Sequence, residues 1–195
     1  MSVTPRRRLT PEQRRAELLA SAEQMVDEEG PDSLSLDLVA ERSGCSRNLA
    51  YTYFPNRDAL VTELQGRMRS RLGDRLRSEL PRGAGPAAWI RSWGEVVFDE
   101  AEVHGGMLLL LFARDRLNPD DETRGMNLAV IALVADRLAT EPAIGPDRAR
   151  VLARLLLGMV ISGVLAIAVD REPRARVAAE FGGVVDRLLA TSAPH

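Results

Sequence analysis

The sequence predicts an all-helical protein of about nine helices. Aromatic residues make up only 4% of the 195 residues, and apolar side chains nowhere alternate with polar ones over the length of a strand. Apolar residues instead recur every three or four positions, in segments that begin at capping residues and end at Gly or Pro. Because 45% of the residues are hydrophobic, the chain can bury a sizeable core.

The first predicted helix follows a capping box. Thr10 precedes Pro11, which suits the first helical position, and Gln13 lies three residues after Thr10. Apolar residues then recur on one face until Gly30, which is followed by Pro31. A helix from about residue 11 to residue 29 is therefore expected.

Two short helices follow, on either side of a tight turn. Ser35 can cap the first and Ser46 the second, and Gly44 lies between them. The second helix should end near Phe54, because Pro55 disfavours helical geometry in the residue before it. Residues 35–54 are therefore predicted to form a helix-turn-helix within an N-terminal domain of residues 1–56.

A long connector helix is predicted over residues 57–80. Each step of four residues overshoots a helical turn by about 40°, so an apolar row with that spacing winds around the helix. Such a helix can pack on one domain at its start and on a second domain, residues 81–195, at its end. The winding row is Leu60, Leu64, Met68, Leu72, Leu76 and Leu80. The arginines expected to form a solvated face are Arg67, Arg69, Arg71, Arg75 and Arg77.

The C-terminal domain is expected to contain five further helices. A Gly/Pro-rich break over residues 81–86 separates it from the connector, and Gly105-Gly106 divides its first two helices. The expected segments are 86–104, 107–117, about 121–140, 146–169 and 173–190.

The inventory of reactive side chains argues against an enzyme. The chain has two His and one Cys, without HExxH, paired cysteines or a phosphate-binding loop, so no catalytic residue, metal or cofactor is expected. Cys45 is interpreted as a small turn residue, with redox sensing left open. A reducing, cytoplasmic location is expected, and the fifteen apolar residues 155–169 are too few for the roughly 20 that span a bilayer.

Residues 35–60 resemble the DNA-binding module of the tetracycline-repressor family. The resemblance implies a homodimer that binds a palindromic operator on double-stranded DNA and releases it when a small-molecule effector is bound. The matching stretch is 26 of the 195 residues. The residues that carry it are Ser35, Val39-Ala40, Gly44-Cys45-Ser46, Tyr51, Phe54 and Pro55-Asn56-Arg57-Asp58-Ala59-Leu60.

The helix after Gly44 is the expected recognition helix. Arg47 can pair with guanine and Asn48 with adenine through two hydrogen bonds each, while Thr52 can contact a thymine methyl group. Helix N-termini and tyrosine hydroxyls suit phosphates. The predicted DNA-binding residues are Ser35, Ser46, Arg47, Asn48, Leu49, Tyr51, Thr52, Tyr53 and Arg57.

The sequence departs from the family pattern at four of these positions. Arg57 replaces a common lysine, Asn48 a frequent glycine, Leu49 a hydroxyl residue and Tyr53 a common histidine. These changes should affect which operator is read. The N-terminal arginines 6–8 could reach the minor groove or form a solvated tail, and both alternatives stay open.

The C-terminal domain is expected to bind the effector, a small and apolar molecule, although inward aromatic and Met side chains are also typical of a plain core. His104 and Arg114 are the candidate polar groups. The other predicted pocket residues are Trp89, Trp93, Val97, Met107, Phe112, Met126, Val130 and Met159.

The last two helices are the predicted dimer interface. Between residues 155 and 169 only Ser162 is polar, so both sides of this helix should be covered, either by a second copy, as the family implies, or by the chain's own core. The predicted interface residues are Leu152, Leu156, Val160, Gly163, Ile167, Phe181, Val184 and Leu188. A helical ligand-binding dimer or a small enzyme without DNA binding remains the alternative.

Overall fold

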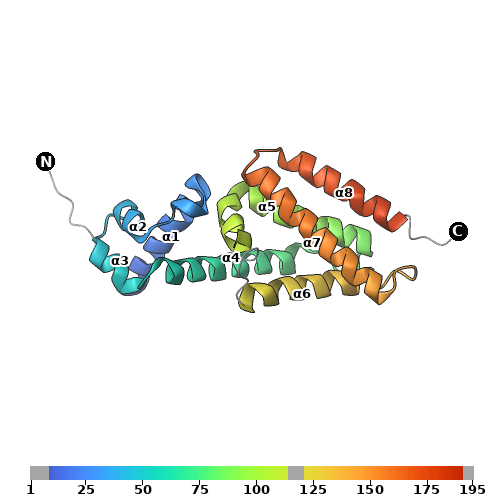
Figure 1. Ribbon diagram of the computed structural model, residues 1–195, viewed down its shortest axis with the longest axis horizontal. Coiled ribbons are helices and arrows are strands. Elements are labelled where there is room, and N and C mark those ends of the chain that lie inside the picture. The colour runs from blue at the N-terminus through green and yellow to red at the C-terminus, as the bar shows by residue number, and fades with distance from the viewer. Residues whose placement is uncertain (1–8, 114–120, 191–195) are drawn as a thin grey trace.

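Eight α-helices and one 3-10 turn make up the described part of this computed structural model, shown in Figure 1. The structure describes residues 9–113 and 121–190, and within these it leaves out the side chains of Ala113, residues 121–124 and Met126. No strand occurs in the described ranges. The predicted all-α fold class is confirmed.

Three helices form the N-terminal body, and the capping signals in the sequence account for their starts. The Gln13 amide donates to Thr10 Oγ1 (3.2 Å) and the Thr10 amide to Gln13 Oε1 (3.0 Å), so the capping box is present. Ser35 and Ser46 cap the next two helices. The elements are α1 (Pro11–Glu29), the 3-10 turn η1 (Pro31–Ser33), α2 (Leu36–Arg42) and α3 (Arg47–Tyr53).

The connector helix α4 (Arg57–Glu79) runs from this body along the C-terminal helices (Figure 1). It packs on α1 and on α5. Its apolar row is buried from Leu60 to Leu72 and becomes half-buried at Leu76 and Leu80. The predicted winding therefore lets one helix serve two hydrophobic surfaces.

Helix α5 (Pro86–Ala113) replaces the two helices expected at residues 86–104 and 107–117. His104 alone leaves helical geometry (φ −128°, ψ 42°), so the chain kinks there and continues as a helix. The Gly105-Gly106 pair therefore marks a kink and not a break, which reduces the predicted nine helices to eight within the described residues.

The two glycines at the kink allow two other helices to approach α5 closely. A Cβ atom on Gly106 would lie 2.8 Å from Asp27 Cα and closer still to the Val26 carbonyl of α1. A Cβ on Gly105 would lie 2.6 Å from Ala168 Cβ in α7. The kink is thus held between α1 and α7.

The C-terminal bundle is completed by α6 (Asp121–Leu138), α7 (Pro146–Ala168) and α8 (Arg174–Ala190). Helix α7 contacts α5, α6 and α8. Gly163 receives the edge of Phe98, whose ring packs edge-on against Phe181 of α8 (centroids 5.6 Å apart). By length and composition alone α7 could cross a membrane, although one face of it packs on α5, α6 and α8.

Replacing Gly106 by Ala should destabilise the protein. The added methyl group would overlap the α1 backbone, which cannot move without disturbing the core, so a cost of about 1–3 kcal/mol is expected. Urea denaturation of the variant measures this cost. The control is Gly125→Ala in α6, where an added Cβ would meet no other atom within 4 Å. This control should be neutral or stabilising by about 0.5–1 kcal/mol. Equal stability of the two variants would contradict the close approach.

Candidate nucleic-acid interface and internal groove

The first turns of α3 project from the N-terminal body. Gly44 makes the preceding turn with a positive φ of 62°, which suits glycine, and Ser46 Oγ then accepts the Leu49 amide hydrogen (3.3 Å). The outward side chains are Ser46, Arg47, Asn48, Tyr51 and Thr52, while Leu49 and Tyr53 are half-buried. The structure therefore brings these seven predicted residues together on one short, capped helix.

Arg47 forms a surface ion pair with Asp37 of α2. Its Nη1 lies 3.2 Å from Asp37 Oδ2, and the two side chains are 72% and 41% exposed. A pair this exposed contributes only about 0–1 kcal/mol. Arg47 can therefore exchange Asp37 for another acceptor at little cost.

Arg57 is exposed and also donates hydrogen bonds to two backbone carbonyls. Its Nε donates to the Leu34 carbonyl and its Nη2 to the Pro31 carbonyl, both at 2.9 Å. These bonds tie the start of α4 to the segment between α1 and α2. Ser35, another of the residues predicted for phosphate binding, caps α2 from this segment.

Arg15 positions α3, a role that the sequence did not reveal. Its Nη1 donates to the Tyr53 carbonyl (3.1 Å), its Nε donates to Glu63 (3.1 Å), and its guanidinium lies 4.7 Å from the centroid of the Phe54 ring. It joins α1 to the end of α3 and to α4. Its partners are 38 to 48 residues away, so no local pattern could identify them.

Two further predictions concern residues next to α3. Cys45 is half-buried, and its Sγ accepts a weak hydrogen bond from Ser43 Oγ at 3.5 Å, as suits a turn residue. Arginines 6–8 lie outside the described residues.

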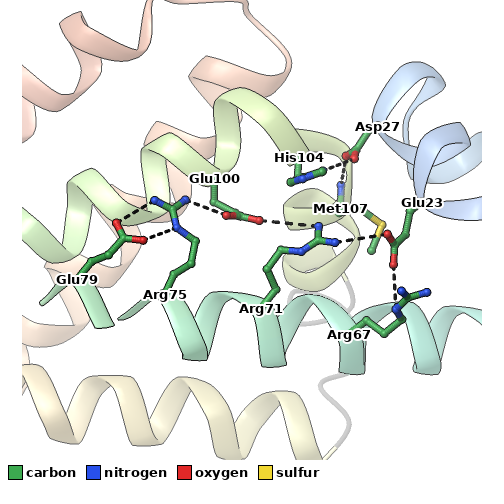
Figure 2. A network of polar contacts seen from close by, with 9 residues as sticks. All are labelled: Glu23, Asp27, Arg67, Arg71, Arg75, Glu79, Glu100, His104 and Met107. Atoms are coloured by element: carbon green, nitrogen blue, oxygen red, sulfur yellow. Dashed lines mark hydrogen bonds and ion pairs between the residues drawn. The ribbon is translucent and has the colours of Figure 1, made fainter. Parts of the chain in front are cut away.

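A ladder of ion pairs joins α1, α4 and α5 (Figure 2). Arg67 Nε lies 3.2 Å and Arg71 Nη2 lies 3.5 Å from the carboxylate of Glu23 in α1. Arg71 Nη1 lies 4.0 Å and Arg75 Nη1 lies 2.9 Å from the carboxylate of Glu100 in α5. The expected solvated face is therefore wrong for Arg67, Arg71 and Arg75, which face two other helices. It holds for Arg77, which is 72% exposed and pairs with Asp74 of its own helix.

The ladder pairs carboxylates with guanidinium groups at each step. Glu100 is only 4% exposed and depends on its arginine partners to offset the cost of burying a carboxylate. Arg75 also donates two hydrogen bonds to Glu79 (2.7 and 3.0 Å). Hydrogen bonds to Glu79 and Glu100 raise the pKa of Arg75, and the bond from Arg75 lowers the pKa of Glu79.

His104 belongs to a second link between α1 and α5, shown in Figure 2. Its Nδ1 lies 2.8 Å from Asp27 Oδ2, while Asp27 Oδ1 accepts the Met107 amide hydrogen at 2.9 Å. His104 and Met107, both predicted for the ligand pocket, thus lie at the α1 contact and do not line the groove described next.

A groove of about 360 Å³ lies between α4, α5, α6 and α7. Four predicted pocket residues line it, namely Trp93, Val97, Phe112 and Val130. Trp89 is buried without lining it, and Arg137 covers its ring at 5.2 Å. Arg114 and the Met126 side chain lie outside the described residues. Arg69, Arg77 and Asn127 also line the groove, and no pattern in the sequence marked them as pocket residues.

A wider trough of about 720 Å³ lies open between α7 and α8. Met159, predicted for the ligand pocket, lines this trough together with Gly163, Phe181 and Val184 of the predicted interface. Leu152 and Leu188 are half-buried.

The other predicted interface residues lie on the inner face of α7. Leu156, Val160 and Ile167 are buried within the chain itself, so their side chains are not available to a second copy. The exposed apolar stripe of α7 lies on the helix surface beside this buried inner face. It consists of Val151, Leu155, Gly158, Ser162 and Val169, with Leu155 60% exposed.

Solved structures with this fold are numerous. A TetR-like transcriptional regulator from Rhodococcus sp. RHA1 is 19% identical over 94% of this chain and 99% of its own (TM-score 0.77). A tetR-family regulator from Streptomyces coelicolor is 25% identical over 95% and 84% (TM-score 0.69). AibR, in complex with isovaleryl coenzyme A and operator DNA, is 15% identical over 88% and 97% (TM-score 0.67). No curated protein matches the chain.

The family comparison concerns the N-terminal body. Residues 18–64 match the family model of the bacterial regulatory proteins, tetR family. This segment runs from α1 through both short helices into α4, and it contains the exposed face of α3. Residues 18–64 therefore match the tetR family of bacterial regulatory proteins, and solved structures described as regulators of that kind share the fold of the chain.

Proposed function

We propose that the protein is a homodimeric transcriptional repressor that binds a palindromic operator and releases it when a small molecule occupies the groove beside α4. The observation that carries the proposal is the exposed, Ser46-capped start of α3, which presents Arg47 and Asn48 outward. The AibR structure, with its acyl coenzyme A and operator DNA, is a precedent for both kinds of partner in this fold.

The chemistry of α3 supports reading of the major groove. Arg47 and Asn48 suit guanine and adenine, and Tyr51, which is 47% exposed, is placed one turn on to reach a phosphate. The Thr52 hydroxyl donates to the Asn48 carbonyl (2.9 Å), which favours its methyl group as the contact with a base. Arg57 holds α4 in place, so the phosphate contact predicted for it is not part of the proposal.

The exposed stripe of α7 and the trough beside it are the proposed dimer interface. A second copy related by a twofold axis would cover the stripe and fill the trough, because a twofold interface uses the same surface on both subunits. Operator binding then requires the two α3 helices to lie about 34 Å apart, one turn of DNA.

An effector in the groove would act through α4. This helix forms one wall of the groove and is tied to α1 by the Glu23 pairs, so a shift of α4 would turn the N-terminal body. In this cytoplasmic protein, DNA would be bound by residues 1–56 and the effector by residues 81–195. The connector between them would be residues 57–80. A ligand that prefers the shifted arrangement depopulates the DNA-competent one.

The alternative, a helical ligand-binding dimer or small enzyme without DNA binding, leaves the exposed polar side chains of α3 without a role. The two proposals predict different effects of substitutions in α3, because only a repressor has an operator affinity to lose.

Arg47→Ala combined with Tyr51→Phe should weaken operator binding without unfolding the protein. Both side chains are exposed, and loss of one bidentate base contact costs about 1–3 kcal/mol, or roughly 5- to 150-fold in affinity. The operator would first be selected from random duplexes, and binding then measured by fluorescence anisotropy at fixed salt. Asp37→Ala frees Arg47 and should bind at least as tightly as wild type. A wild-type protein that ignores all duplexes at low salt would support the alternative.

Leu155→Arg should convert the dimer to a monomer. The substitution places a charge at the centre of the exposed α7 stripe, where a buried unpaired charge is costly. Sedimentation equilibrium measures the mass. The matched control is Val103→Arg on α5, equally exposed at 66% but outside the stripe, which should stay dimeric. An unchanged mass for Leu155→Arg would remove α7 from the interface.

Glu23→Gln should weaken operator binding although it lies far from α3. It removes the α1 end of the ladder, so the body samples more orientations, and the fraction competent for DNA falls. A loss of about 1 kcal/mol, or roughly fivefold, is expected in the same anisotropy assay. Glu17→Gln, whose partner Arg14 lies on the same helix, is the control and should have no effect. Equal affinities would show that the ladder does not set orientation.

A further inference from the structure

The N-terminal body carries an excess of negative charge. Residues 9–56 contain nine carboxylate side chains and four arginines. The sequence-independent part of DNA binding comes from basic side chains that neutralise phosphates. Over residues 9–56 this part is weak, so the body depends on a few well-placed groups to hold a duplex.

Arg47 is the arginine of this body that is most accessible to a duplex. All four arginines form ion pairs with carboxylates, but the Arg47 side chain is 72% exposed and the other three are at most 42% exposed. The pairs are Arg14–Glu17, Arg15–Glu63, Arg42 with Glu28 and Glu29, and Arg47–Asp37. The carboxylate that pairs with Arg47 is therefore placed to influence its contacts with DNA.

The Asp37–Arg47 pair joins α2 to α3 and leaves most of the guanidinium available. Asp37 lies in the first turn of α2, and its Oδ2 is 3.2 Å from Arg47 Nη1. A guanidinium has five N–H donors in a planar fork, and a guanine base takes two of them, at its N7 and O6 atoms. Arg47 can therefore contact a guanine while Asp37 stays beside it.

A DNA phosphate is a different acceptor for Arg47, because it carries a negative charge. A phosphate bound by Arg47 would come close to the Asp37 carboxylate, or Arg47 would have to leave Asp37. Like charges a few ångströms apart repel each other, whereas the edge of a guanine is neutral. The carboxylate therefore opposes contact of Arg47 with a phosphate more than contact with a base.

We propose that Asp37 is a specificity-determining residue, which allows Arg47 to bind a guanine and opposes its binding to the phosphates of unrelated DNA. Specificity is a difference between two affinities, and a charge that weakens the unwanted complex increases it. The inference deepens the proposed function and rests on it, because it concerns how the proposed operator is distinguished from other sequences.

The test compares two duplexes of equal length, the selected operator and an unrelated sequence. Asp37→Asn should bind the unrelated duplex about fivefold more tightly than wild type at the same salt concentration, the effect of an exposed charge pair near its usual upper limit. Its slope of log affinity against log salt should be steeper by about two on this duplex, since each subunit of the dimer gains one phosphate contact. Operator affinity should rise less, so the ratio of the two affinities should fall. Both affinities are measured by fluorescence anisotropy over a series of salt concentrations.

Two further variants serve as controls. Asp32→Asn removes the same charge from an exposed position in η1, and it should change the affinities for the two duplexes alike. Asp37→Glu keeps a carboxylate on α2 and should keep the affinity ratio close to that of wild type. Circular dichroism of Asp37→Asn checks that its helices are intact.

A double-mutant cycle shows whether Asp37 acts through Arg47. In an Arg47→Ala background, Asp37→Asn should raise affinity for the unrelated duplex only as much as Asp32→Asn does, because no guanidinium is left to release. A direct contact of Asp37 with a base would instead make Asp37→Asn lower operator affinity, and this result would contradict the inference.

An affinity ratio that is unchanged in Asp37→Asn, or that falls equally in Asp32→Asn, would overturn the inference. Operator binding, and with it the proposed function, would still stand. A wild-type protein that binds the selected operator no better than the unrelated duplex would contradict the proposed function and the inference together.

Discussion

The contact between α1 and the kink of α5 determines where the N-terminal body lies. Because Gly106 has no side chain, the α1 backbone at Val26 can approach α5 closely. Asp27 then accepts hydrogen bonds from His104 and from the Met107 amide. Since Arg15 joins α1 to the end of α3, the direction in which α3 points follows from this packing. A small residue in the C-terminal bundle therefore sets the geometry of a surface in the other half of the chain.

The ladder through α4 is a link of a different physical kind. Close packing resists small displacements, because core contacts are lost or become repulsive within a fraction of an ångström. Ion pairs at 2.9–4.0 Å tolerate such displacements and can exchange partners. A buried carboxylate such as Glu100 adds little net stability, yet it specifies which arginines must lie opposite it. The ladder thus fixes the register of α4 between α1 and α5 more than it stabilises the fold.

Local signals predicted most of the fold, and long-range contacts account for what they missed. Capping residues such as Thr10 and Ser46 act within one turn, so the sequence located their helices correctly. Gly105 and Gly106 were interpreted as a break because a glycine pair weakens a helix, whereas here they accommodate neighbouring helices. His104 binds a residue 77 positions away, and the α4 arginines bind Glu23 and Glu100, which no periodicity reveals. The positions on α3 were predictable because exposure follows directly from its short, capped geometry.

Helix α7 shows why apolar composition alone cannot assign a face. A helix that is apolar all round gives the same pattern for its core side and for an interface side. The contact of Phe98 with Gly163 settles the inner side, and this leaves Leu155 and its neighbours outward. The inner side also carries Leu157 and Val160 into the groove beside α4. In the proposed dimer, α7 would therefore touch the ligand on one side and the partner subunit on the other. Binding of a ligand in the groove would then change the distance between the two α3 helices through α7 and α4 together.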